Sequence, residues 1–229
     1  MNKFFKTLQK YLLEYLPKQK CCSHNTIRSY KQALHLFVTY LTTAKQMKIK
    51  QIDFEMITRE VVLDFLVWLE ESRNCSASSR NQRLMVLRSF FHYSGVLDET
   101  LIALSFSIND IPLKKEQGKV VGFLTETALE ALLAQPNTCS QKELRNQFFM
   151  ILMYDTAGRC GEILGLKVRD LYLNTQYPIA YLHGKGNKTR SVPLLNKTVE
   201  HCKQYLKLFH KDEDFESEEY LFYTITHGV

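Results

Sequence analysis

Apolar residues recur at helical spacing through most of this chain, and one short stretch breaks the pattern. Between residues 25 and 41 the apolar positions share a single helical face: Ile27, Tyr30, Leu34, Phe37, Val38 and Leu41. The period changes to that of strands after Leu173, where residues 179–183 and 190–194 flank a Gly-Lys-Gly-Asn turn whose glycines suit positive φ. The sequence therefore predicts a mainly α protein with a small β-hairpin or sheet in its second half.

The first half of the chain, residues 2–107, has the pattern of a helical bundle. Separate helices are predicted over residues 3–16, ending at Pro17, over 25–41 after a cap at Ser23 or Asn25, and over 58–72 and 78–94. The last of these begins with Ser78-Ser79-Arg80-Asn81-Gln82-Arg83, which is rich in side chains that bind phosphate. An ordinary amphipathic helix with basic flanks explains the same segment equally well.

A segment without sustained periodicity separates this bundle from a second domain. Residues 109–122 contain Pro, Gly and a run of charges, which predicts a linker. After it we expect a helix capped by Thr125, an apolar core helix over 142–156, the hairpin, a helix over 198–209 and a strand near Glu219. The predicted domains are residues 1–108 and 123–229.

Charge favours one class of partner. The net charge is +6, but six acidic residues lie between Asp212 and Glu219, so residues 1–211 hold 30 Lys/Arg against 18 Asp/Glu. Such a balance suits a polyanion, because Lys and Arg that neutralise phosphates release condensed counterions. The acidic run itself is most simply a solvated loop.

Cysteine spacing and hydropathy exclude other classes. The six cysteines form no C-x-x-C pair, so we expect reduced thiols, no zinc site and no disulfide framework. No apolar run approaches the length of a membrane span, and the N-terminus lacks a signal-peptide pattern. The sequence predicts a cytoplasmic protein that does not enter membranes.

Two motifs carry a family resemblance. The first is Asp155-Thr-Ala-Gly-Arg-Cys-Gly-Glu-Ile-Leu-Gly-Leu-Lys-Val-Arg-Asp170, and the second is Gly184-Lys185-Gly186-Asn187-Lys188-Thr-Arg-Ser-Val-Pro-Leu194. Together they resemble the first half of the active site of tyrosine recombinases, the phage-integrase family. The helical half resembles that family's core-binding, SAM-like domain, which implies a helical DNA-binding domain followed by an incomplete α+β catalytic domain.

The resemblance implies a reaction without metal or cofactor. In this family a Tyr attacks phosphorus, a 3′-phosphotyrosyl bond forms and a 5′-hydroxyl leaves. Arg159 matches the first catalytic arginine, Glu162 matches its acidic companion, and Lys185 matches the hairpin lysine that acts as general acid. The alternatives are a buried, purely structural Arg159–Glu162 pair and an ordinary solvated turn lysine.

The same resemblance predicts double-stranded DNA as the partner, held between two domains. We expect the DNA-contacting side chains to include seven further polar residues: Arg28, Lys31, Arg80, Asn81, Arg83, Lys188 and Arg190. None of these is predicted to take part in the chemistry.

The sequence also departs from the family pattern. The family continues with His-x-x-Arg, a further His or Trp and a nucleophilic Tyr, but no His here is followed by Arg three residues on. His227 lies in His-Gly-Val, and Tyr220 and Tyr223 precede any second arginine. We therefore expect a catalytic domain that is truncated and that binds a phosphate without cutting DNA.

Three functions remain open from the sequence. The first is a site-specific recombinase or integrase of a phage or mobile element, tetrameric on paired sites when full-length and monomeric as this chain. The second is a truncated regulator that occupies recombination sites without cleaving them. The third is a helical protein–protein scaffold that binds no DNA, for which duplex affinity would show no salt dependence.

Overall fold

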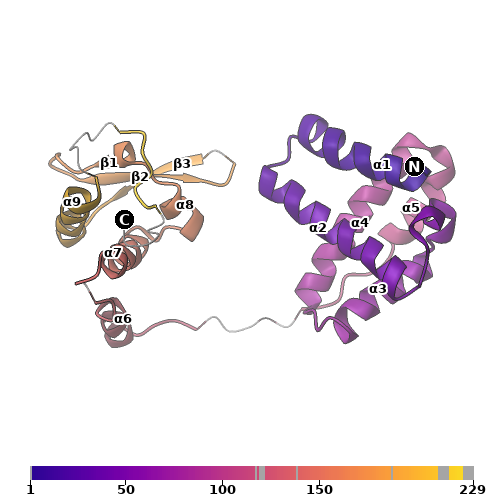
Figure 1. The fold of residues 1–229 in the computed structure, drawn as a ribbon, viewed down its shortest axis with the longest axis horizontal. Helices are drawn as coiled ribbons and strands as arrows, with labels where there is room; N and C mark the ends of the chain where they lie inside the picture. The colour runs from indigo at the N-terminus through magenta and orange to yellow at the C-terminus, as the bar shows by residue number, and fades with distance from the viewer. Residues whose placement is uncertain are drawn as a thin grey trace. The chain divides into compact units, whose positions relative to one another are not determined.

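The computed structural model of this chain describes residues 2–116, 118, 122–137, 139–186, 188–210 and 217–223. They form two units, residues 1–120 and 121–229 (Figure 1). The predicted fold class, mainly α with a small antiparallel sheet in the second half, is confirmed. No described helix is both long enough and apolar enough to cross a bilayer.

The first unit is all helical. Its elements are α1 (Lys3–Lys10), a π-helical continuation (Tyr11–Gln19), α2 (His24–Thr43), 3-10 turns at Ile49–Gln51 and Phe54–Met56, α3 (Arg59–Glu71), α4 (Ala77–Leu97), a 3-10 turn at Glu99–Leu101 and α5 (Ile102–Asn109). Buried aromatic rings fill the centre: Phe4 meets Phe90 edge to face at 5.6 Å, and Phe37 meets Phe65 at 5.1 Å. Each such pair adds about 0.5–1.5 kcal/mol to the burial of its rings.

Serine and threonine caps fix where these helices begin. The Ser23 hydroxyl accepts from the Thr26 N–H, Thr58 accepts from Val61, and Ser76 accepts from Ser79, which satisfies N–H groups that a helix start leaves free. The cap predicted at Ser23 is confirmed, and α4 begins one residue before the predicted helix and ends three residues after it.

The prediction that the first helix ends at Pro17 is wrong. Helical winding continues through Pro17 to Gln19 as a π-helix, and the Lys20 N–H donates to the Tyr15 carbonyl five residues back. An α-helical proline collides with the carbonyl four residues before it. The wider π turn moves that carbonyl away, so the ring fits inside the helix.

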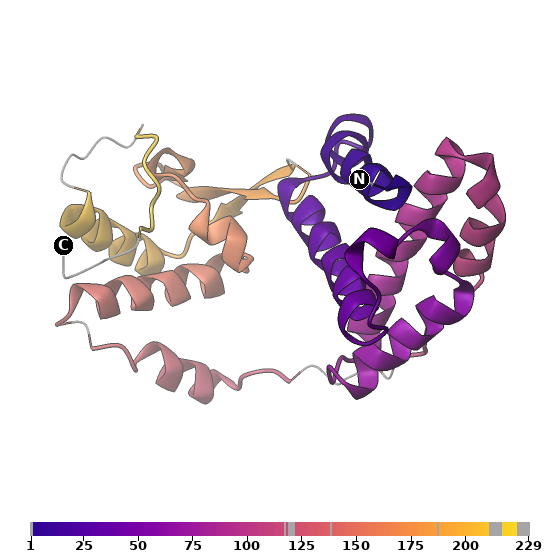
Figure 2. The same ribbon diagram turned by 45° about the vertical axis from the view of Figure 1, so that its right-hand side comes forward.

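The second unit packs helices beneath a small sheet. It contains α6 (Glu126–Leu133), α7 (Gln141–Thr156), α8 (Cys160–Leu164), a 3-10 turn (Val168–Asp170), β1 (Leu171–Tyr172), β2 (Ile179–Gly184), β3 (Lys188–Pro193) and α9 (Asn196–Phe209). The strands pair antiparallel in the order β1-β2-β3. Figure 2 shows α7 and α9 side by side, and the stacked rings of Phe148 and Tyr205, 4.8 Å apart, join them.

The predicted hairpin is confirmed, and its register places Gly184 opposite Lys188. The strand expected near Glu219 is reduced to a single bridge between Tyr220 and Lys167. Most of the acidic run predicted as a loop, residues 212–216, lies outside the described residues, as do Asn187 and His227. Short helices α5 and α8 carry no periodic signal and were not predicted separately.

Candidate functional site

The turn that presents Arg159 accepts only small residues. Helix α7 ends at Ala157, which has a left-handed φ of 47°, and the Gly158 N–H donates to the Met153 carbonyl. A Cβ at Gly158 would lie 2.4 Å from Cδ1 of Ile163, so any larger residue there would force the buried Ile163 side chain to shift. The chain therefore turns tightly out of the core helix, and Arg159 becomes the residue that caps α8.

Glu162 holds Arg159 in place. Its Oε2 accepts from the Arg159 N–H at 3.1 Å, and its Oε1 accepts from Nη1 of Arg159 at 2.7 Å. The Glu162 side chain is 5% exposed and the Arg159 side chain 78% exposed. The pair is therefore not buried as a whole: a buried carboxylate orients a guanidinium whose remaining donors face solvent.

A third residue joins this carboxylate from the hairpin. Nη2 of Arg190 on β3 donates to Oε2 of Glu162 at 2.9 Å and to the Ala157 carbonyl at 3.2 Å. Hydrogen bonds from the Arg159 main chain, then from Arg190 and the Arg159 guanidinium, lower the pKa of Glu162 to about 2. Two guanidiniums around one carboxylate leave a net positive charge at this place.

The hairpin that carries Lys185 lies directly against this network. A Cβ at Gly184 would come within 2.9 Å of Oε1 of Glu162, so the strand approaches the carboxylate as closely as glycine allows. Lys185 and Lys188 are exposed on either side of the turn, where Gly186 has a φ of 76°. The structure thus brings Arg159, Glu162 and Arg190 together with Gly184, the residue before Lys185.

A second contact at the hairpin was not found from the sequence. Nδ1 of His183 on β2 lies 3.0 Å from the Thr189 hydroxyl on β3, and Nε2 lies 3.1 Å from Oδ1 of Asp170. Asp170 also accepts from the Lys167 N–H at 2.9 Å. Nothing in the local pattern of Lys-Val-Arg-Asp signals a partner thirteen residues away.

Three of the residues predicted to bind DNA in the first unit are accessible or partly so. Arg28 and Lys31 are exposed three residues apart on α2. Arg83 on α4 is half-buried, and its Nη1 donates to the Ser79 carbonyl at 2.8 Å. A phosphate contact by these residues stays a prediction.

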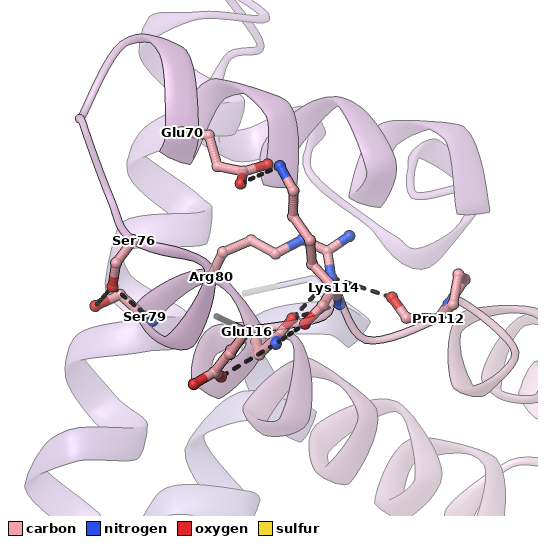
Figure 3. A network of polar contacts seen from close by, with 8 residues as sticks. Glu70, Ser76, Ser79, Arg80, Pro112, Lys114 and Glu116 are labelled. Carbon is pink, nitrogen blue, oxygen red and sulfur yellow. Dashed lines mark hydrogen bonds and ion pairs between the residues drawn. The ribbon is translucent and has the colours of Figure 1, made fainter. Parts of the chain in front are cut away.

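Arg80 and Asn81, also predicted to contact DNA, lie near the start of α4. Both are buried. Figure 3 shows Arg80 in a polar network with Pro112 and Lys114 of the chain that follows α5. Arg80 Nη1 donates to Asn81 Oδ1 and to the Pro112 carbonyl, each at 3.1 Å. Asn81 donates to the Lys114 carbonyl at 2.8 Å and accepts from the Lys114 N–H at 3.0 Å. They secure the start of the predicted linker, and a phosphate contact would have to share or replace these bonds.

The surroundings of this network explain how it tolerates burial. Arg88 donates to the Ile111 carbonyl, and Lys114 Nζ pairs with Glu70 Oε1 at 2.7 Å. Burial lowers the pKa of Arg80, and Glu70 opposes that effect. In the described part of the chain no cluster of three or more His, Cys, Asp or Glu residues suits a metal ion.

Comparison with known proteins places the chain in a family. The phage integrase family model matches residues 122–227, and that of the phage integrase N-terminal SAM-like domain matches residues 8–94. The chain is 31% identical over 187 residues to "Putative integrase/recombinase y4rD" of Sinorhizobium fredii, and 30% identical over 209 residues to "Tyrosine recombinase XerC" of Staphylococcus carnosus. These matches cover 82% and 91% of this chain, and 66% and 65% of the two relatives.

Solved structures share the fold. XerH site-specific recombinase bound to palindromic difH substrate matches with a TM-score of 0.65 at 22% identity, over 97% of this chain and 65% of that chain. The Tn1549 transposon integrase in complex with transposon right end DNA matches with a TM-score of 0.66 at 14% identity, over 95% of this chain and 71% of that chain. The chain belongs to the tyrosine recombinase (phage integrase) family and spans about two thirds of the length of the curated relatives it matches.

Proposed function

We propose that this chain binds duplex DNA at recombination sites of a phage or mobile element and that its side chains bind the phosphate at which strands are exchanged. The observation that carries the proposal is the exposed Arg159 guanidinium, held by a buried carboxylate beside the Lys185 hairpin. Relatives named as integrases or recombinases support it.

Each side chain has a distinct task in this proposal. Arg159 donates to the non-bridging oxygens of the phosphate, where negative charge collects as phosphorus becomes pentacoordinate. Lys185, on an exposed turn, lies close to the phosphate; where a Tyr forms a bond to phosphorus and the 5′-oxygen leaves, this lysine would give that oxygen its proton. Glu162 touches neither group and fixes the direction of Arg159.

Cutting also needs a nucleophile and a second arginine. The family supplies these from a His-x-x-Arg motif and a later Tyr, and no His-x-x-Arg occurs in these 229 residues. We propose that this chain, tested alone, is a monomer that binds DNA without forming a phosphotyrosyl bond. A protein that also carries the second arginine and the Tyr is proposed to assemble as a tetramer on paired DNA sites. A regulator that occupies such sites without cleaving them is the second candidate, because it needs the same features.

The salt dependence of duplex binding tests the proposal. Affinity of this chain is expected to fall steeply with salt, and Arg159→Ala is expected to lower the slope of log affinity against log salt by about one. Lys207→Ala, an exposed charge on α9, is the charge-matched control. Affinity independent of salt would favour the protein–protein scaffold, and a covalent adduct on a nicked duplex would overturn the absence of cleavage.

A further inference from the structure

Arg190 on β3 is partly exposed but donates to groups on both sides of Arg159. We infer that Arg190 is a positioning residue, which ties the β2–β3 hairpin to the turn that presents Arg159 and keeps the charge of Arg159 available to a phosphate. The inference concerns the same site, and only the part about phosphate binding by Arg159 rests on the proposed function. The part about the Arg190 hydrogen bonds can be tested on the protein without DNA.

The bonds of Arg190 reach both sides of the Arg159 turn. One nitrogen, Nη2, donates to the Ala157 carbonyl at 3.2 Å and to Oε2 of Glu162 at 2.9 Å. Ala157 precedes Arg159 by two residues and Glu162 follows it by three. A single guanidinium group from β3 therefore holds the residues that flank Arg159, and its planar donors keep a fixed direction.

The strand register explains why Arg190 can do this. Arg190 pairs with Leu182 in the β2–β3 ladder, and paired residues lie on the same face of a sheet. Leu182 is fully buried, so this face covers the core, and Arg190 extends across it to α8. The next pair towards the turn on that face is Gly184 and Lys188, where Gly184 approaches Glu162.

Charge gives Arg190 a second effect. Glu162 alone would neutralise Arg159, because their atoms lie 2.7 Å apart. Arg190 brings a second positive charge to the same buried carboxylate, so the three side chains together remain positive. The outward donors of Arg159 then act from a cationic cluster rather than from a neutral pair, which favours an anion at that place.

Hydrogen exchange of the free chain tests the geometry. The Arg159 N–H donates to Glu162, and Arg190→Ala is expected to speed its exchange by about tenfold or more, because the carboxylate loses a charge-assisted partner. Lys188→Ala is the matched variant on the same face and strand, and it should leave this amide unchanged. Arg190→Lys keeps the charge without the planar fork, so only partial protection is expected.

Unchanged protection of the Arg159 amide in Arg190→Ala would overturn the inference. Slow exchange at Ala180 and Leu182, inside the β2–β3 ladder, shows whether each variant is folded. If Arg190→Ala fails that control, Arg190→Met, which keeps an unbranched side chain without the donors, decides the same question, and unchanged protection of the Arg159 amide in it would overturn the positioning role.

A double-mutant cycle on duplex affinity tests the second part. If Arg190 acts through Arg159, Arg190→Ala weakens binding in the parent chain and has little further effect in Arg159→Ala. Additive losses, each with a slope reduced by about one, would mean that Arg190 contacts phosphate by itself and would overturn this part. If the parent chain binds no duplex, the proposed function fails, while the exchange experiment still decides where Arg190 acts.

Discussion

The His183 ring on β2 lies between Thr189 on β3 and Asp170 before β1, and its Nε2 is 3.1 Å from Oδ1 of Asp170. The carboxylate is nearly buried, whereas half of the imidazole side chain is exposed. The imidazole therefore links a rigid, buried anchor to the hairpin that carries Lys185. This contact lies outside the Arg159–Glu162–Arg190 network.

His183→Ala is expected to lower the free energy of unfolding of the second unit by about 1 kcal/mol, because Asp170 loses one of its two hydrogen-bond partners. Thr189→Val removes only the hydroxyl contact and should cost less. Urea denaturation monitored on second-unit residues measures both. Equal stability of His183→Ala and the parent chain would contradict the anchoring role.

Gly184→Ala is expected to destabilise the second unit by about 1–3 kcal/mol, because the added Cβ would meet Glu162 Oε1 at 2.9 Å and push the hairpin away. Gly161→Ala is the control: a Cβ there has open space, and alanine favours a helix by up to about 1 kcal/mol. Thermal denaturation compares the two. The prediction fails if both substitutions shift the midpoint in the same direction.

Acid is expected to weaken the second unit through Glu162. Its pKa in the folded chain, about 2, lies below the ordinary value of 4.5. A lowered pKa means that the ionised group stabilises the fold fully above about pH 4.5 and loses that effect as pH falls towards 2. Stability measured across this window should fall more steeply for the parent chain than for Glu162→Gln. Parallel pH profiles would rule out this contribution.

Asn81→Ala is expected to lower the free energy of unfolding of the first unit by about 1–3 kcal/mol, because the main-chain N–H and carbonyl of Lys114 each lose a hydrogen bond to the buried Asn81 side chain. The neighbouring Gln82 is exposed, so Gln82→Ala serves as the control on the same helix. Exchange of the Lys114 amide should quicken only in Asn81→Ala. Continued protection of that amide would show that Asn81 does not hold this segment.

Local patterns were sufficient to predict the longer helices and the hairpin, but not the helical winding through Pro17 or the short helices α5 and α8. The helix over residues 24–43 has one apolar face and a serine cap, and the hairpin has two glycines at its turn, so both follow from neighbouring residues. Arg159 and Lys185 were likewise found from contiguous motifs, by resemblance to the family rather than from spacing alone.

The contacts that organise the site could not be predicted in this way. Arg80 binds a carbonyl 32 residues later, and Arg190 binds a carboxylate 28 residues earlier. Such partners depend on how elements pack, which periodicity does not report. The sequence pattern around Arg80 therefore gave no sign that its Nη1 donates to the Asn81 side chain and the Pro112 carbonyl, and its contact with phosphate stays a prediction.

The burial of Arg80 changes how the basic character of this chain should be counted. Condensed counterions leave the DNA when a protein cation neutralises a phosphate, and a guanidinium buried within the first unit, such as that of Arg80, does this less readily. The Arg88 and Arg190 guanidiniums also donate to protein oxygens. The ions released when a duplex binds should thus be fewer than the tally of arginines and lysines implies. Some of the arginines that make the sequence basic stabilise the fold through hydrogen bonds to protein oxygens.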